Sequence, residues 1–398
     1  MKTGLAMGLK NLVKVLCYRF FGVFGIQKKK IFFNNYFGRP YGCNPKYICE
    51  AIHKRHPEYD LVWEVRKGCF SGFPDYVRTV PFDSPKAIYE RSTSKVWVQN
   101  VRLRSTAKKR KGQFYIQTWH GAIGVKKCEG DAKDKITPQS LKDAYHDSPL
   151  IDVMISNSRF CTEVYKRAFF YDGKIAEVGY PRNDLMACKK DALDTRKKIC
   201  KSYHIPEEKK IFFYAPTFRK DSNLWDTSSL DIKRALAALE NKFGGNWICL
   251  LRLHPWAAKA CEGKMQFDET IINATHYPDI QELLAASDAM ATDYSSCIFD
   301  FMIQRKPAFM FATDIQSYVK ERGLLFDPFQ LPFPCATTND ELEKAISEFD
   351  ETSYKQKTDD FFAQHLLKDD GLAAERVATM VEQFVNGESL ENILKECI

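Results

Sequence analysis

The segment "FYIQTWHGAIG", residues 114–124, is a strand-like apolar run that ends in Trp-His-Gly. A histidine at the point where a strand meets a glycine-bounded loop is placed to meet a ligand. A positioned imidazole is also a frequent general base. We therefore take His120 as the first candidate catalytic residue.

Three later segments repeat this pattern of an apolar strand followed by polar groups. In "IFFYAPTFRK" the apolar run is followed by Thr217, and in "CLLRLHPW" it is followed by Arg252 and His254. In "AMATDYSSCIFDF" it is followed by Ser295 and Ser296. Arg252 and His254 alternate about Leu253, so both point to one face of an extended segment. The two serines precede a helix, whose unpaired N–H groups attract anions. Together these loops predict a phosphate-binding site.

Each of these groups also has a plainer interpretation. Ser295 and Ser296 would then only cap a helix, and His254 would be a satisfied loop histidine. Arg182, in the loop "GYPRND", either holds an anion bidentately or shapes a turn together with Asn183.

Several other function classes lack their signatures. The chain has no G-x-x-x-x-G-K-[ST] and no G-x-G-x-x-G, which disfavours P-loop and dinucleotide-binding proteins. No paired-carboxylate metal motif stands out, so we expect no metal and no cofactor. No nucleic-acid module is recognisable, so the net charge of +8 predicts other anionic partners. The thirteen cysteines form no C-x-x-C pair, which favours reduced thiols.

Strand-like and helix-like segments alternate along the chain from Lys30 onward, which predicts parallel sheets covered by helices. A charged helical segment, "DTRKKICKSYHIPEEKK", looks like a connector between two such runs. We therefore predict an α/β protein with two Rossmann-like domains, 31–190 and 191–398, that bind ligands beyond the carboxyl ends of their strands.

The N-terminal segment 1–30 differs from the rest of the chain in being both basic and apolar. It contains no acidic residue, and its apolar stretch is broken by Lys10, Lys14 and Arg19. Three internal charges argue against a membrane-spanning helix. The pattern predicts an amphipathic helix lying on an anionic membrane surface, and the alternative is a helix packed on the protein's own surface.

The motifs, in this order, resemble the CDP-glycerol glycerophosphotransferase family, the TagB/TagF-like enzymes that synthesise teichoic acids and related capsular polymers. The matching pieces are "NNYFGRPYGCNPKYI", "QTWHG", "ISNSRF", "GYPRND", "YAPTFR", "LRLHP", "ATDYSSCIFDF" and "RGLLFDP". The resemblance implies a GT-B-like fold, with an acceptor-side N-terminal domain facing a donor-binding C-terminal domain across a cleft. It implies transfer of glycerol phosphate, or a related polyol phosphate, from CDP-glycerol or CDP-ribitol, with release of CMP. The acceptor would be a lipid-linked saccharide or polyol phosphate, reached from the cytoplasmic, inner face of the plasma membrane.

The resemblance also assigns site residues. The family's functional histidines fall on His120 and His254; its substrate-binding positions fall on Gly121, Ala122, Ile123, Gly124, Arg182, Thr217, Phe218, Arg252, Ser295, Ser296 and Asp300. His120 is our candidate general base, while His254 and Arg252 would stabilise the leaving phosphate, although the two histidines could exchange roles. Many family members carry Thr-Pro-Leu-Lys after "HG", whereas this chain reads Ala122-Ile123-Gly124-Val125, which leaves the polyol open. The alternative for Asp300 is a surface or capping carboxylate.

Two other functions fit the same architecture. One is a glycosyltransferase with a nucleotide-sugar donor, which would release a nucleoside diphosphate in place of CMP. The other is a non-catalytic protein that binds membranes or polymers on a transferase fold, against which the presence of both His120 and His254 weighs.

Overall fold

The computed structural model describes residues 2–121, 124–217, 230–253 and 267–395, and the chain forms two compact units. Unit 1 comprises Met1–His120, Glu129–Asp184 and Lys368–Ile398; unit 2 comprises Gly121–Cys128 and Leu185–Leu367. Each is built on one parallel sheet, which confirms the predicted α/β class with two parallel sheets.

Unit 1 contains a seven-stranded parallel sheet of order β3-β2-β1-β4-β5-β6-β7. Its strands are β1 (Gln27–Asn34), β2 (Asp60–Val65), β3 (Val77–Pro81), β4 (Ser94–Gln99), β5 (Phe114–Gln117), β6 (Val153–Ser156) and β7 (Lys174–Glu177). Strand order reverses between β1 and β4, which pair in parallel up to Asn34 and Gln99. A sheet of this type binds ligands at that switch point. β3 was not predicted, because this edge strand has only two buried positions and therefore a weak apolar signal.

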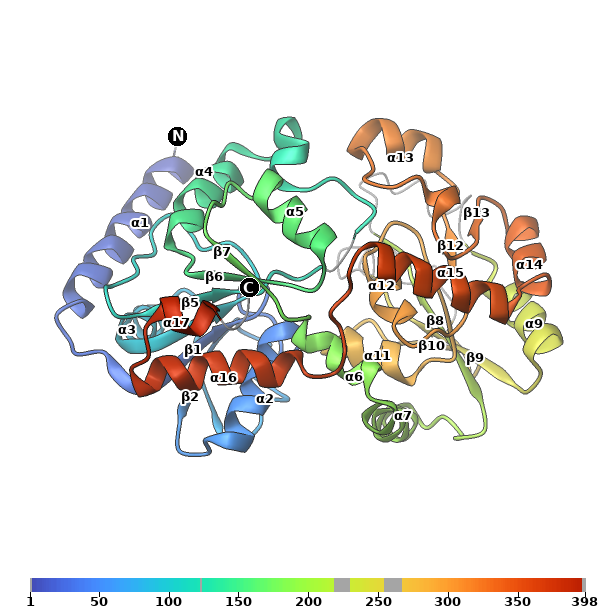
Figure 1. Ribbon diagram of the computed structural model, residues 1–398, viewed down its shortest axis with the longest axis horizontal. Helices are drawn as coiled ribbons and strands as arrows, with labels where there is room; N and C mark the ends of the chain where they lie inside the picture. The colour runs from blue at the N-terminus through green and yellow to red at the C-terminus, as the bar shows by residue number, and fades with distance from the viewer. Residues whose placement is uncertain (1, 122–123, 218–229, 254–266, 396–398) are drawn as a thin grey trace. The chain divides into compact units, whose positions relative to one another are not determined.

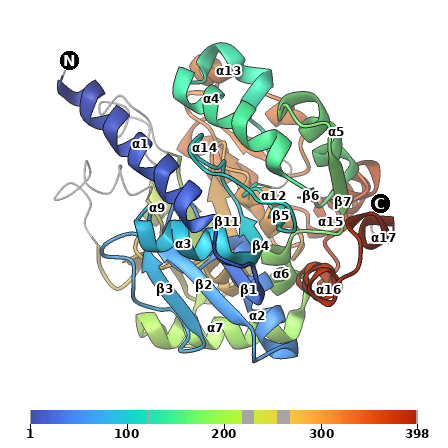
Figure 2. The ribbon, with the colours of Figure 1, turned by 90° about the vertical axis from the view of Figure 1, so that its left-hand side faces the viewer.

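Helices cover both faces of this sheet (Figure 1). They are α1 (Lys2–Phe21), α2 (Cys43–Arg55), α3 (Pro85–Thr93), α4 (Pro138–Asp147), α5 (Arg159–Ala168), α16 (Ala373–Asn386) and α17 (Leu390–Lys395). α16 packs beside α2, and α1 lies along α3, as Figure 2 shows. Ser158 caps α5, because its side chain accepts a hydrogen bond from the N–H of Cys161.

Unit 2 contains a six-stranded parallel sheet of order β10-β9-β8-β11-β12-β13. Its strands are β8 (Lys210–Ala215), β9 (Trp247–Leu251), β10 (Ile271–Asn273), β11 (Ala289–Thr292), β12 (Ala308–Phe311) and β13 (Cys335–Ala336). Its helices include α7 (Lys189–Tyr203), α9 (Ile232–Phe243), α11 (Ile280–Ala286), α12 (Cys297–Met302), α13 (Ile315–Arg322), α14 (Asn339–Ser347) and α15 (Glu351–Gln364), and α6 (Asp184–Ala187) enters the unit from unit 1. Order again reverses between β8 and β11, so Ala215 and Thr292 end at a second switch point.

The end of the chain corrects the predicted domain boundaries. We expected residues 191–398 to form one domain, but the chain leaves unit 2 after Leu367, and α16 and α17 belong to unit 1. The reason is apolar packing: Phe384 of α16 lies on Phe114 of β5, with ring centroids 4.9 Å apart. Sequence periodicity identifies these helices but not the sheet that they cover.

The N-terminal helix α1 is attached to unit 1 along one side. Phe21 lies edge-on to Tyr89 of α3 at 5.4 Å, and Tyr18 accepts a hydrogen bond from Arg91 at 2.9 Å. Lys14 forms an ion pair with Asp83. This is the packing that the alternative interpretation expected. No helix in the described ranges is long and apolar enough to span a bilayer.

Candidate active site

His120 lies just beyond β5 in unit 1, in a frame of aromatic rings. Its ring stacks on Trp119 with centroids 4.2 Å apart and contacts Tyr36 at 5.0 Å. Trp119 has a φ of 52°, in the left-handed region that non-glycine residues rarely adopt. An edge-on contact with Phe169 at 4.7 Å holds the Trp119 ring from its other side. The strained turn thus fixes the direction of the His120 side chain.

The hydrogen bond of His120 defines its tautomer. Nδ1 lies 2.5 Å from the carbonyl oxygen of Asn100, and a carbonyl can only accept, so Nδ1 carries the proton. The neutral ring therefore keeps its lone pair on Nε2. Burial, aided by the Arg182 charge and opposed by the Asn100 hydrogen bond, lowers the pKa of His120 to about 4. The imidazole is neutral near pH 7, as a general base must be.

Asn44 and Arg182 hold the loop that carries His120. The buried Asn44 amide donates to the carbonyls of Thr118 (3.3 Å) and Trp119 (3.1 Å) and accepts from the Arg182 N–H at 3.1 Å. The Arg182 guanidinium is buried and donates to the His120 carbonyl oxygen at 2.7 Å. Arg182 is therefore beside His120, with one guanidinium nitrogen bonded to the backbone.

The rest of the "GYPRND" loop is structural. Asn183 is fully buried, and its amide donates to Asp369 at 2.9 Å; Asn157 donates to the same carboxylate at 2.6 Å. The Tyr180 N–H donates to Asp369 at 2.7 Å, and Asp184 accepts from two N–H groups at the start of α16. These contacts fasten the returning C-terminal segment to unit 1.

In unit 2, Thr217 follows β8 and is tied to Asp293, which follows β11. The Thr217 hydroxyl donates to Asp293 Oδ1 at 2.6 Å, and its N–H lies 3.0 Å from the same oxygen. Asp293 is buried and also accepts from the Tyr294 N–H. The carboxylate thus sets the geometry of both strand-end loops at this switch point.

Arg252 follows β9 and is directed by backbone carbonyls. Its guanidinium donates to the Tyr277 carbonyl at 2.6 Å and lies 3.4 Å from that of Ala274. Arg252 is partly exposed.

The two serines lie at the start of α12, partly exposed. Ser296 occupies the N-cap position, but its side chain makes no capping bond, so capping does not account for it. Ser295 Oγ lies 3.5 Å from the Cys297 N–H, a long contact. A Cβ on Gly121 would lie 3.4 Å from Ser296 Oγ, so this glycine lies against the serine. The structure thereby brings two of the predicted positions together.

Asp300 is buried at 1% exposure and accepts from the Gln281 amide at 3.3 Å. It is thus not a surface carboxylate. Gly124 precedes Val125, whose carbonyl accepts from the Leu325 N–H at 2.7 Å. Four predicted site residues lie outside the described ones: Ala122, Ile123, Phe218 and His254.

Sequence reasoning missed Asn44, Asn100 and Asp369. Each is polar and buried or partly buried, and each holds a predicted site residue or its loop. Asn44 stands in a quoted motif, "YGCNPKY", and Asn100 directly follows a strand, which are the only signals for them. Within the described residues, no group of three or more His, Cys, Asp or Glu side chains could hold a metal ion.

Residues 16–383 match the protein family described as CDP-Glycerol:Poly(glycerophosphate) glycerophosphotransferase. The chain is 30% identical over 369 residues to a teichoic acid poly(glycerol phosphate) polymerase of Staphylococcus epidermidis, covering 90% of this chain but only 51%, about half, of that relative. It is 29% identical over 367 residues to a teichoic acid glycerol-phosphate transferase of Staphylococcus aureus, covering 89% and 93%. The solved structure of the wall teichoic acid polymerase TagF matches with a TM-score of 0.82 at 29% identity, covering 96% of this chain and 97% of that one.

Proposed function

Because the chain belongs to the CDP-glycerol:poly(glycerophosphate) glycerophosphotransferase family, we propose that it transfers a polyol phosphate from a CDP-activated donor to an acceptor hydroxyl. The donor is CDP-glycerol or CDP-ribitol, the acceptor is membrane-linked, and the product belongs to a teichoic acid or a capsular polymer. The observation that carries this proposal is the neutral His120 imidazole, whose Nε2 keeps its lone pair.

The acceptor oxygen attacks the phosphorus that bears the polyol. A new P–O bond forms as the bond to the bridging oxygen of the diphosphate breaks, and CMP leaves with that oxygen. The acceptor proton passes to His120 Nε2. A positioned base of this kind typically contributes about 10²–10⁴-fold to the rate.

The donor side of the reaction is assigned to unit 2, in a GT-B-like arrangement. Arg252, held by the Tyr277 carbonyl, places a fixed positive charge near the leaving phosphate. Ser296 offers a hydroxyl beside Gly121, Ser295 offers a second hydroxyl at the start of α12, and His254 supplies the second histidine of the family.

Membrane docking is assigned to α1. One side of the helix packs on α3, while Leu12, Leu16 and Phe20, at helical spacing, stay 51–63% exposed. The cationic Lys10 and Arg19 flank these residues, and Lys28 and Lys29 follow the helix. Apolar side chains beside basic ones suit an anionic bilayer surface, so the chain would work peripherally at the inner face of the plasma membrane.

The test is CMP release by the full chain, offered CDP-glycerol, CDP-ribitol and nucleotide sugars with a lipid-like acceptor. We expect CMP from one CDP-polyol and a loss of about 10²–10⁴-fold in His120→Ala. His146→Ala is the matched control, because His146 also holds a backbone carbonyl with a ring nitrogen, at 2.7 Å from Ala107. Release of a nucleoside diphosphate from a sugar donor would instead identify a glycosyltransferase.

A further inference from the structure

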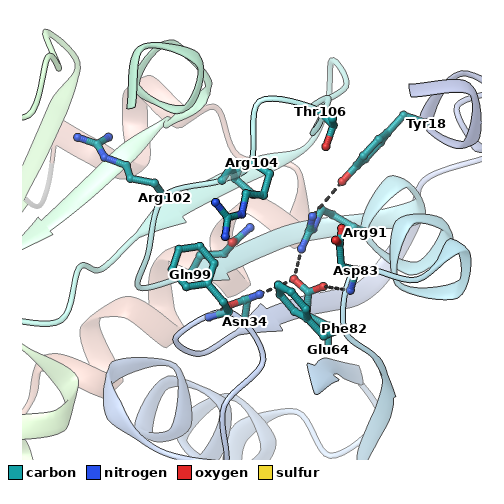
Figure 3. A pocket seen from close by; sticks show the side chains of 12 residues that line it. Tyr18, Asn34, Glu64, Phe82, Asp83, Arg91, Gln99, Arg102, Arg104 and Thr106 are labelled. Carbon is teal, nitrogen blue, oxygen red and sulfur yellow. Dashed lines mark hydrogen bonds and ion pairs between the residues drawn. The ribbon is translucent and has the colours of Figure 1, made fainter. Parts of the chain in front are cut away.

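A small polar pocket opens at the switch point of the unit 1 sheet, on the side covered by α1 and α3. Two of its lining residues, Asn34 and Gln99, are the last residues of β1 and β4, the strands between which the order reverses. Parallel sheets of this kind bind ligands beyond the carboxyl ends of those two strands. Tyr18 of α1 lines the pocket from above, as Figure 3 shows.

One wall of the pocket is a satisfied network. Glu64 accepts hydrogen bonds from Arg91 and Asn34, and from the N–H of Asp83 at 3.3 Å. Arg91 also donates to Tyr18 at 2.9 Å. These contacts join α1, α3 and β2, so they form a rigid wall (Figure 3).

The lining also contains hydrogen-bond donors that have no acceptor in the described part of the chain. Gln99 is 2% exposed, and its Nε2 has no acceptor among the described residues. The same holds for Nε of Arg91, which also lines the pocket. The Arg102 side chain turns away from the other lining side chains (Figure 3) and donates to Asp147 and to the Phe169 carbonyl. Buried donors without acceptors are rare in folded proteins, because each loses its hydrogen bonds to water without replacement. Arg104, 49% exposed, adds a solvent-accessible guanidinium to the lining.

The charged and hydrogen-bonding side chains of the lining indicate which ligand groups the pocket would bind. Arg91 and Arg104 lie beside Glu64 and Asp83 in the lining, and the lining nitrogens without partners are donors, which suits phosphate oxygens. The hydroxyls of Tyr18 and Thr106 and the amide of Asn34 suit polyol hydroxyls.

The pocket is connected to the candidate base through its lining. The Arg102 guanidinium lies 5.9 Å from the centre of the Trp119 ring, which stacks on His120. Gln99 directly precedes Asn100, whose carbonyl fixes the His120 tautomer. A ligand bound here would therefore contact the same framework that positions the base.

We propose that this pocket binds the polyol-phosphate end of the acceptor. The inference rests on the proposed function, and it assigns the acceptor to unit 1 while the donor groups lie in unit 2. Gln99, Arg91 and Arg104 hold the phosphate, and the hydroxyl and amide groups hold the polyol.

The test measures binding of glycerol 3-phosphate to the full chain by calorimetry, beside inorganic phosphate and CDP-glycerol. Gln99→Met keeps the side-chain length and removes the donor, and Arg104→Ala removes the exposed cation. We expect each to weaken glycerol 3-phosphate binding by about tenfold or more, with CDP-glycerol binding changed less than about twofold. Arg159→Ala is the control, because Arg159 is 54% exposed and pairs with one carboxylate, Glu177, outside the pocket.

Gln99→Met also separates a ligand role from a structural one. Replacing a buried donor that has no acceptor is neutral or stabilising, so the thermal midpoint should stay level or rise while binding falls. Unchanged glycerol 3-phosphate binding in both variants, or equally tight inorganic phosphate, would overturn the assignment. An equal loss of CDP-glycerol binding would show that the pocket binds the donor and not the acceptor. CMP release by the wild type tests the reaction separately, so either proposal can fail alone.

Discussion

His120 donates its Nδ1 proton to the carbonyl oxygen of Asn100 across 2.5 Å, and this bond leaves Nε2 as the basic nitrogen. Asn100 is itself fixed, because its amide donates to Asn35 at 2.7 Å and its side-chain oxygen accepts from the Tyr36 N–H at 2.9 Å. The tautomer of the candidate base is thus determined by two loops that follow β1 and β4.

The first prediction concerns the titration of His120. We expect its ring to titrate near pH 4 rather than at its ordinary pKa of 6.5, because burial disfavours the imidazolium. Histidine NMR signals followed against pH would measure this, with the His120 signal identified by its absence from His120→Gln. A midpoint at 6.5 would contradict the buried, neutral base.

The same shift has a consequence for stability. Since the folded pKa lies below 6.5, the unfolded chain binds a proton that the folded chain excludes. The contribution of His120 to stability is therefore complete above about pH 6.5 and is lost as the pH falls toward about 4. Denaturation midpoints in this window should fall less steeply in His120→Gln than in the wild type.

A second prediction concerns Asn44, which joins the His120 loop to Arg182. Asn44→Ala removes three hydrogen bonds from a fully buried site, and we expect a loss of about 2–3 kcal/mol in the free energy of unfolding. It should also lower kcat more than it raises the KM for the CDP-polyol, because the base loses its position. Asn246→Ala, at an exposed position, is the control and should change neither quantity.

A third prediction tests the attachment of the C-terminal segment. Asp369→Asn would turn an amide donor toward the donors of Asn157 and Asn183, and we expect the urea midpoint to drop by the equivalent of about 2–3 kcal/mol. Asp370→Asn changes the neighbouring carboxylate, whose partner is the partly exposed Arg376. A surface pair is worth at most about 1 kcal/mol, so this control should stay near the wild type. Equal midpoints for the two variants would refute the attachment.

A fourth prediction concerns the exposed side of α1. The double variant Leu16→Glu/Phe20→Glu should lose most of its binding to anionic phospholipid vesicles, because it places two charges where apolar side chains would enter the interface. The matched control is Leu193→Glu/Phe329→Glu, at positions 61% and 62% exposed in unit 2. CDP-glycerol binding should survive in both. Vesicle pelleting that does not distinguish the two variants would exclude α1 as the docking surface.

The sequence alone determined the local features of this protein. The alternation of apolar strands and helices, the loops that end the strands, and the position of His120 at the end of one of them are set by patterns within about ten residues. Local hydrophobic periodicity and capping chemistry decide such features, so they can be recognised without tertiary information. The ordered motifs also sufficed to indicate the family.

Only the tertiary structure decided which polar groups meet. Asn44 and Arg182 lie 138 residues apart in the chain, and Asn183 and Asp369 lie 186 apart. No periodicity encodes such pairs, because they form only when the strands assemble in their order and bring distant loops to one edge of a sheet. The same reason explains why Arg182 and Asn183 looked alike in sequence yet differ in the fold. One lies beside the candidate base, and the other holds the end of the chain.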